Sequence, residues 1–255
     1  MPTEIEYTED GIAYKRIEDH PGRPTIIFLH DSLGCIETWG DFPERLGELS
    51  ECNVLIYDRP GYGRSHPMDE RDKDYLEVQA DLLCELMEIW SIDDAVLYGH
   101  SDGGSIALIT GSKYPSKISG ILTEGAHVFV EDDAVEGVKD TAELYRTTEL
   151  KSKLKRYHGE KTEEMFKAWA ETWTAEWFRD WNIENFLPSI DCPVLVIQGE
   201  EDEYGTTAQV EKIVDGTSGP SSGLIVPGAG HTPHKETQDI VLENSSKFII
   251  RVTDD

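Results

Sequence analysis

The stretch of sequence that decides the fold is AVLYGHSDGG, residues 95–104. Its apolar first half, 95–99, is typical of a strand, and residues 101–114 are typical of a helix. Between them the pentapeptide GHSDG, 99–103, has the spacing G-x-S-x-G. A serine on a sharp turn between a strand and a helix stands exposed, and the two glycines let the strand and the helix approach closely. The pattern therefore predicts that Ser101 is a nucleophile.

The rest of the chain alternates short apolar runs with helical stretches, which predicts an α/β fold with a mainly parallel central sheet flanked by helices. Near-continuous apolar runs suit strands that are covered on both faces. The predicted strands are Thr25–His30, Asn53–Asp58, Ala95–Gly99, Gly120–Glu124, Pro193–Gly199 and Gly223–Val226. The other predicted elements are helices at Asp74–Trp90 and about His234–Ile250, and an antiparallel hairpin within Ile5–Ile17.

One region breaks this alternation. Residues 127–188 contain no strand candidate, and their tryptophans are spaced four residues apart. This spacing places the indoles near one face of a helix, if one helix runs that far. We therefore expect a helical cap at 127–188, inserted into a core formed by 1–126 and 189–255. The four tryptophans are Trp169, Trp173, Trp177 and Trp181.

A nucleophilic serine needs a base, and the base needs an orienting acid. His231 lies in the run PGAGH just after the last predicted strand, so it is expected at the same sheet edge as Ser101. The acid is expected to follow an earlier strand, and Asp202 lies in the run GEEDE after PVLVIQG. Glu124, at the end of the run GILTE, is an alternative acid, and His234 is the nearest rival for the base.

The remaining site residues follow from the chemistry of acyl transfer. Two backbone N–H groups must bind the oxyanion that forms on the attacked carbonyl. One is expected from Asp102, and the other from Ser32, or alternatively Leu33, in the loop after the first core strand. Substrate-contacting candidates at the loop and the cap are Leu33, His127, Trp169 and Trp173.

The composition is strongly acidic, and it narrows the possible partners. Asp and Glu number 51 against 23 Lys and Arg, so the formal net charge is −28. Such a surface repels nucleic acid and anionic membranes. It is either an ordinary solvated surface or an adaptation to high salt, and the charge alone does not decide between them.

The sequence offers no sign of export, membrane insertion or metal binding. The first residues, MPTEIEYTED, do not resemble a signal peptide, and no apolar run is long enough for a membrane span. The four cysteines are scattered without a CxxC pair. We therefore expect a cytoplasmic protein that uses no metal and no organic cofactor.

Together these motifs resemble the α/β-hydrolase superfamily, in its serine-nucleophile subgroup. The resemblance covers nearly the whole chain and rests on GHSDGG at Ser101, YDRPGYGRS at 57–65, GEED ending at Asp202 and GAGH ending at His231. The subgroup includes carboxylesterases, biphenyl hydrolase-like enzymes and hydrolases of meta-cleavage products. Many members have His-Gly at the oxyanion loop, where this chain has His-Asp-Ser at 30–32.

Three functions are compatible with this pattern. The leading interpretation is a hydrolase of carboxylic esters with small or medium acyl groups, acting through a Ser-His-Asp triad. The alternative is a C–C bond hydrolase that cleaves vinylogous 1,5-diketones, the meta-cleavage products. A ligand-binding protein without activity is the third, although an apparently complete triad argues against it. The expected partner is a small-molecule ester or diketone.

Overall fold

The computed structural model describes residues 4–67 and 71–254. Eight strands form one sheet in the order β1-β2-β4-β3-β5-β6-β7-β8. The pairs β1·β2 and β2·β4 are antiparallel, and every other neighbouring pair is parallel. The strands are β1 (Glu6–Tyr7), β2 (Ala13–Ile17), β3 (Thr25–Leu29), β4 (Asn53–Tyr57), β5 (Ala95–His100), β6 (Ile118–Glu124), β7 (Val194–Gly199) and β8 (Ser221–Val226). The predicted α/β fold with a mainly parallel sheet is confirmed.

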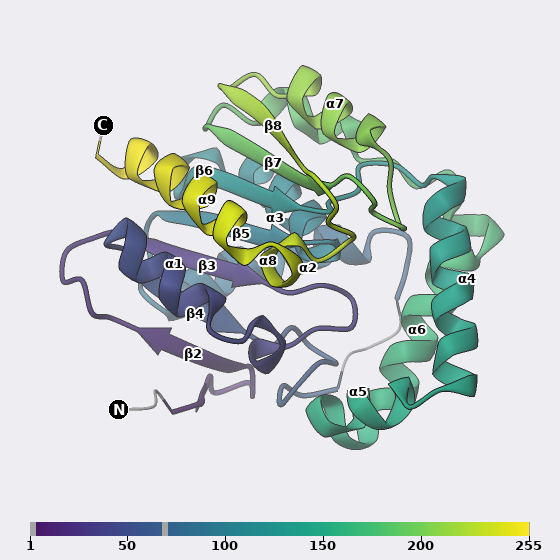
Figure 1. The fold of residues 1–255 in the computed structure, drawn as a ribbon. Coiled ribbons are helices and arrows are strands. Elements are labelled where there is room, and N and C mark those ends of the chain that lie inside the picture. Colours follow the sequence, from purple (N-terminus) through teal and green to yellow (C-terminus); the bar gives the residue numbers. More distant parts are fainter. Residues whose placement is uncertain (1–3, 68–70, 255) are drawn as a thin grey trace.

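Helices cover both faces of the sheet, as Figure 1 shows. On one face lie α1 (Phe42–Ser50), α8 (Pro233–Glu236) and α9 (Gln238–Thr253). On the other face lie α2 (Tyr75–Ile89) and α3 (Asp102–Lys113), and α7 (Thr207–Gly216) packs against β7 and β8. The C-terminal helix, expected as one piece from about residue 234 to 250, is divided at Thr237, where ψ is 49°.

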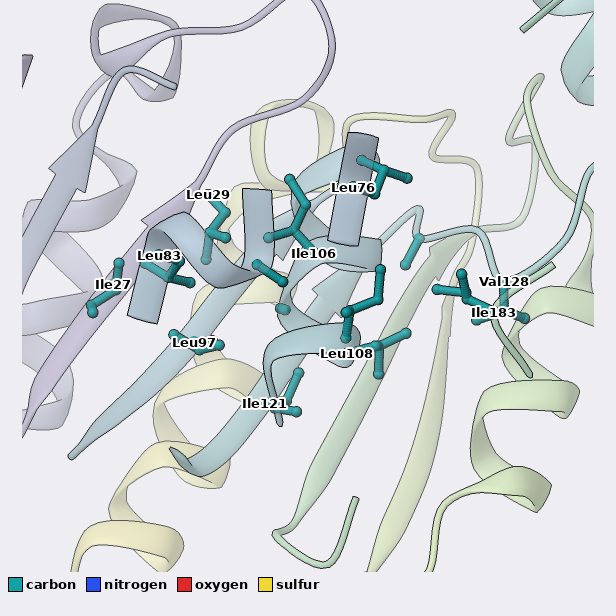
Figure 2. Packing of buried hydrophobic residues seen from close by; sticks show 14 of the residues in the cluster. Ile27, Leu29, Leu76, Leu83, Leu97, Ile106, Leu108, Ile121, Val128 and Ile183 are labelled. Carbon is teal, nitrogen blue, oxygen red and sulfur yellow. The ribbon is translucent and has the colours of Figure 1, made fainter. Parts of the chain in front are cut away.

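The alternation of side chains along each strand explains why the strands are apolar throughout. In β3, Ile27 and Leu29 belong to the core layer beneath α2 and α3, whereas Ile26 and Phe28 belong to the layer beneath α1 and α9. Figure 2 shows the first of these layers, where Ile106 of α3 lies among the strand side chains. Burial on both faces therefore favours apolar residues at successive positions of a central strand.

A helical insertion lies between β6 and β7. It contains α4 (Asp132–Thr147), α5 (Leu150–His158) and α6 (Thr162–Thr174), and Figure 1 shows these helices grouped beyond one end of the sheet. The insertion is anchored to the α/β core through buried aromatic side chains that share one apolar cluster with α2 and α3.

The expectation that four tryptophans share one helix face is wrong. Helix α6 ends at Thr174, because Ala175 has an extended backbone with ψ of 141°. Trp169 and Trp173 are buried on α6, but Trp177 follows in a short 3-10 helix and is 50% exposed. Trp181 is buried again, with its ring 5.8 Å from that of Trp173.

Candidate active site

Ser101 occupies a strained turn between β5 and α3. Its φ of 54° lies in the left-handed region, which residues other than glycine rarely adopt. Two glycines make this turn possible, because a Cβ on Gly99 would lie 2.2 Å from the carbonyl oxygen of Gly103, and a Cβ on Gly103 would lie 2.1 Å from that of Leu29. The N–H of Ser101 donates to the carbonyl of Glu124 at 2.8 Å, which joins the turn to the end of β6.

His231 lies in the loop between β8 and α8, and it contacts the acid predicted for it. Its Nδ1 lies 2.9 Å and 3.0 Å from the two carboxylate oxygens of Asp202. Burial alone would lower the pKa of His231, but the carboxylate of Asp202 raises it above its usual value. Burial alone would likewise raise the pKa of Asp202, and His231 keeps it below its usual value. The ionised Asp202 therefore accepts a hydrogen bond from Nδ1–H of His231, which leaves Nε2 as the basic atom of the imidazole.

Two residues that the sequence analysis did not single out hold Asp202 in place. The side-chain amide of Gln198 donates to Oδ2 of Asp202 at 2.7 Å, and the N–H of Tyr204 donates to Oδ1 at 2.9 Å. Gln198 is a buried amide within the otherwise apolar strand β7. A polar residue in an apolar strand is visible in the sequence, and it could have identified Gln198 as a residue of the site. Nothing in the sequence distinguished Tyr204, because its role depends on the shape of the loop.

The backbone of His231 is fixed as well. Nε2 of His100 lies 2.8 Å from the carbonyl oxygen of His231, and since a carbonyl only accepts, this nitrogen carries the proton. Burial lowers the pKa of His100 to about 4, so it is neutral near pH 7. The role of His100 is therefore structural.

The alternative residues, Glu124 and His234, form a separate pair. Oε1 of Glu124 accepts from the backbone N–H of His234 at 3.0 Å and lies 2.7 Å from its Nδ1. Both side chains are buried. Glu124 therefore binds His234, and Asp202 is the carboxylate that contacts His231.

A pocket of about 60 Å³ brings together most of the residues singled out from the sequence. Ser101 and His231 lie at its base, and no hydrogen bond joins Ser101 Oγ to His231 among the described residues; such bonds often tighten only with substrate bound. Asp31 and Tyr204 also line it, as do Ala134 and Val138 of α4. The pocket is further lined by Ser32, Leu33, Asp102, His127, Trp169 and Trp173.

The two amides expected to bind an oxyanion have no competing partner in the part of the chain that the structure describes. Asp102 is the first residue of α3, so its N–H has no acceptor within the helix. The N–H of Ser32 makes no hydrogen bond among the described residues, whereas that of Leu33 donates to Oδ2 of Asp31 at 3.4 Å. This difference favours Ser32 over Leu33.

The electrostatics of the pocket are acidic. Burial alone would raise the pKa of Asp31, but His100, Lys235 and His30 hold it well below its usual range. Asp31 is therefore ionised, and within 4–67 and 71–254 no Lys or Arg lines the pocket. A larger hollow of about 400 Å³, which Lys161 and other residues line, shares none of the pocket's described residues.

One group of side chains has the composition of a metal site. Ligand atoms of His100, Glu124 and His234 lie within 4.8 Å of one another. These side chains already make hydrogen bonds within the protein, however. Glu124 accepts from His234 at one oxygen and from Tyr98 at the other, and His100 donates to a backbone carbonyl. This group therefore fits a hydrogen-bonded structural role better than metal coordination.

Comparisons with known proteins identify the family of the chain. The pattern described as "Alpha/beta hydrolase family" matches residues 26–243. The human protein named serine hydrolase BPHL is 30% identical over 213 residues, which cover 78% of this chain and 70% of the human one. An *Escherichia coli* 2-succinyl-6-hydroxy-2,4-cyclohexadiene-1-carboxylate synthase is 30% identical over only 107 residues, 42% of this chain and 40% of its own length.

Solved structures show the same fold at lower identity. A structure from *Nitrososphaera gargenis*, from a study of carboxylesterases, has a TM-score of 0.77 at 19% identity and covers 98% of this chain and 99% of its own. The enol-lactonase of *Burkholderia xenovorans* LB400 has a TM-score of 0.75 at 19% identity, with 96% and 99% covered. No helix of 4–67 and 71–254 is both long and apolar enough to cross a membrane. From its matched length and its fold, this chain belongs to the alpha/beta hydrolase family.

Proposed function

We propose that the protein is a serine hydrolase that cleaves carboxylic esters of small acyl groups. The observation that carries the proposal is one pocket holding Ser101 on a strained strand–helix turn and His231 bonded to Asp202. A serine hydroxyl, a base and an orienting carboxylate are the parts that nucleophilic acyl transfer requires.

In the proposed reaction Ser101 Oγ attacks the ester carbonyl while His231 Nε2 takes the hydroxyl proton. The amides of Ser32 and Asp102 bind the oxyanion of the tetrahedral intermediate, and Asp202 stabilises the imidazolium. The intermediate expels the alcohol, which receives the proton from His231, and an acyl group remains on Ser101. A water molecule then gives its proton to His231 and attacks the acyl carbon, and this releases the carboxylic acid and restores Ser101.

The size of the pocket supports short acyl groups. Pockets for drug-sized ligands occupy roughly 300–1,000 Å³, and the cavity around Ser101 is about 60 Å³. The bulky side chains of Trp169 and Trp173 lie on α6, and they line the pocket on the side of the insertion. We therefore propose that residues 127–188 act as a cap that limits acyl length.

The charge of the pocket favours esters over the alternative C–C bond hydrolysis. A ring-fission dienoate carries a carboxylate, which would enter a pocket lined by the ionised Asp31 and, among described residues, by no basic side chain. The carboxylate of Asp31 and that of the dienoate would repel each other, and such repulsion is stronger in a partly buried site than in water. A neutral ester avoids this repulsion.

The test is a series of p-nitrophenyl esters of increasing acyl length, with a meta-cleavage dienoate included. Acetate and butyrate esters should be hydrolysed faster than the decanoate, and the dienoate should not be cleaved. Ser101→Ala is the control for background hydrolysis. A wild-type protein no faster than Ser101→Ala on every ester would contradict the proposed function, and cleavage of the dienoate alone would replace it with C–C bond hydrolysis.

A further inference from the structure

The pocket around Ser101 contains several buried polar atoms without a hydrogen-bond partner among the described residues. They are Ser32 Oγ, Asp102 Oδ1, His127 Nδ1 and Trp173 Nε1, and all four side chains line the same cavity. An unpaired polar atom in the interior is unfavourable, and such atoms are rare in folded proteins. Their gathering in one pocket indicates a ligand that supplies the missing hydrogen bonds.

The hydrogen-bonding role of His127 is fixed by its other nitrogen. Nε2 lies 2.9 Å from the carbonyl oxygen of Tyr204, so Nε2 carries the proton. Burial lowers the pKa of His127, which keeps the ring neutral. Nδ1 is therefore a hydrogen-bond acceptor. The N–H of Tyr204 is in turn bonded to Asp202, so the position of His127 is tied to the loop that carries the orienting acid.

Trp173 supplies the complementary group. An indole Nε1–H can only donate. The rings of Trp173 and His127 are 5.1 Å apart at an angle of 62°, so a donor from α6 and an acceptor from the loop after β6 belong to neighbouring rings that line the same pocket. The His127 ring is also 6.0 Å from that of His231, so this pair lies beside the base of the proposed reaction.

We propose that Trp173 and His127 bind a neutral hydroxyl group of the substrate, and that the enzyme prefers esters of 2- or 3-hydroxy acids. This inference rests on the proposed ester hydrolysis. A hydroxyl accepts one hydrogen bond and donates another, so it satisfies Trp173 and His127 together. An ammonium group only donates and would leave Trp173 unpaired, and a carboxylate only accepts and would leave His127 unpaired.

The other two unpaired atoms do not change this assignment. The carboxylate of Asp102 accepts from the hydroxyl of Tyr75 at 3.1 Å through its other oxygen, and Arg59 lies 3.9 Å from it, so its charge is compensated within the protein. The hydroxyl of Ser32 can donate or accept, and it is compatible with either face of a bound ester.

The experiment compares ethyl 3-hydroxybutyrate with ethyl butyrate, and ethyl lactate with ethyl propanoate, in a pH-stat. The readout is the ratio of kcat/KM for the hydroxylated ester to that for its plain analogue. A site built to bind a hydroxyl rejects the analogue that lacks it, so the wild-type ratio should be at least about tenfold for one pair. Trp173→Phe and His127→Phe should each bring that ratio close to one.

Trp177→Phe is the matched control. Trp177 belongs to the same insertion, but it is 50% exposed and does not line the pocket of Ser101, so the kcat/KM ratio of this variant should remain that of the wild type. A wild-type ratio near one with ester hydrolysis intact would overturn the hydroxyl assignment alone. A high ratio that both phenylalanine variants retain, or faster cleavage of ethyl 3-aminobutyrate than of ethyl 3-hydroxybutyrate, would overturn it too. Failure to cleave any of these esters would instead count against the proposed function.

Discussion

Two carboxylate–imidazole pairs lie at the carboxyl edge of the sheet, and they have nearly the same contact geometry. Asp202 and His231 are 2.9 Å apart, and Glu124 and His234 are 2.7 Å apart. Each acid lies at or just after the end of a central strand, and both histidines lie in the segment after β8. Distance alone does not distinguish a catalytic pair from a structural one.

The surroundings of the two pairs differ. The His231 side chain is 11% exposed, and it shares a pocket with Ser101. The His234 side chain is 2% exposed, and its ring packs 4.8 Å from Trp39 and 5.5 Å from Phe42. The second oxygen of Glu124 accepts from Tyr98. The Glu124–His234 pair, the inner pair, therefore joins α8 to the sheet. Only the Asp202–His231 pair, the outer pair, lies where it can exchange a proton with a substrate.

The largest expected difference concerns turnover. Asp202→Asn removes the charge that stabilises the imidazolium of His231, and it should reduce kcat about 10³–10⁴-fold. The fold should persist, because asparagine has nearly the same shape and its carbonyl oxygen can still accept one of the hydrogen bonds that Gln198 and Tyr204 donate to Asp202. Ester hydrolysis and circular dichroism on the same sample measure both effects.

The matched change in the inner pair should act on stability. Glu124→Gln removes one charge from a buried pair and should lower the free energy of unfolding by about 3–5 kcal/mol. Because Glu124 does not line the pocket of Ser101, kcat per folded molecule should change less than about tenfold. Urea unfolding and active-site titration provide the two quantities. A Glu124→Gln variant that is stable but inactive, beside an active Asp202→Asn, would reverse the roles assigned to the two acids.

The pH dependence gives a smaller but specific difference. Only neutral imidazole can accept the serine proton, so kcat/KM falls as the pH falls through the pKa of His231. Because Asp202 raises that pKa, the half-maximal pH should lie above about 6.5, the usual value for histidine. Residual activity of Asp202→Asn should show this midpoint at lower pH, since the strongest influence that opposes burial is then removed. The midpoint should stay in place in Glu124→Gln, and an equal shift in both variants would argue against the distinction.

The sequence predicted the parts of the molecule that depend on local pattern. Strands β3 to β7 appear as apolar runs, since each is buried on both faces, and the turn at Ser101 appears in its glycines. The predicted strand at 223–226 begins two residues earlier, at Ser221, where alternating exposure hides the pattern.

Features set by tertiary packing were not predictable in this way. The spacing of the tryptophans would place the indoles near one face only if one helix ran through all four, but Ala175 is extended and Trp181 returns to the core from a different segment. The choice between Asp202 and Glu124 depends on which strand end faces the loop of His231. The unpaired nitrogens of His127 and Trp173 become visible only when α6 and the loop after β6 are brought together.

The most direct test of the account is to react the protein with a fluorophosphonate and map the adduct by peptide mass spectrometry. The reagent phosphonylates an activated serine, and only Ser101 lies on the turn between β5 and α3 with His231 in the same pocket. The account predicts one adduct, on Ser101, that is lost in Ser101→Ala and forms much more slowly in Asp202→Asn than in Glu124→Gln. An adduct on another residue, or full hydrolytic activity in Ser101→Ala, would contradict it.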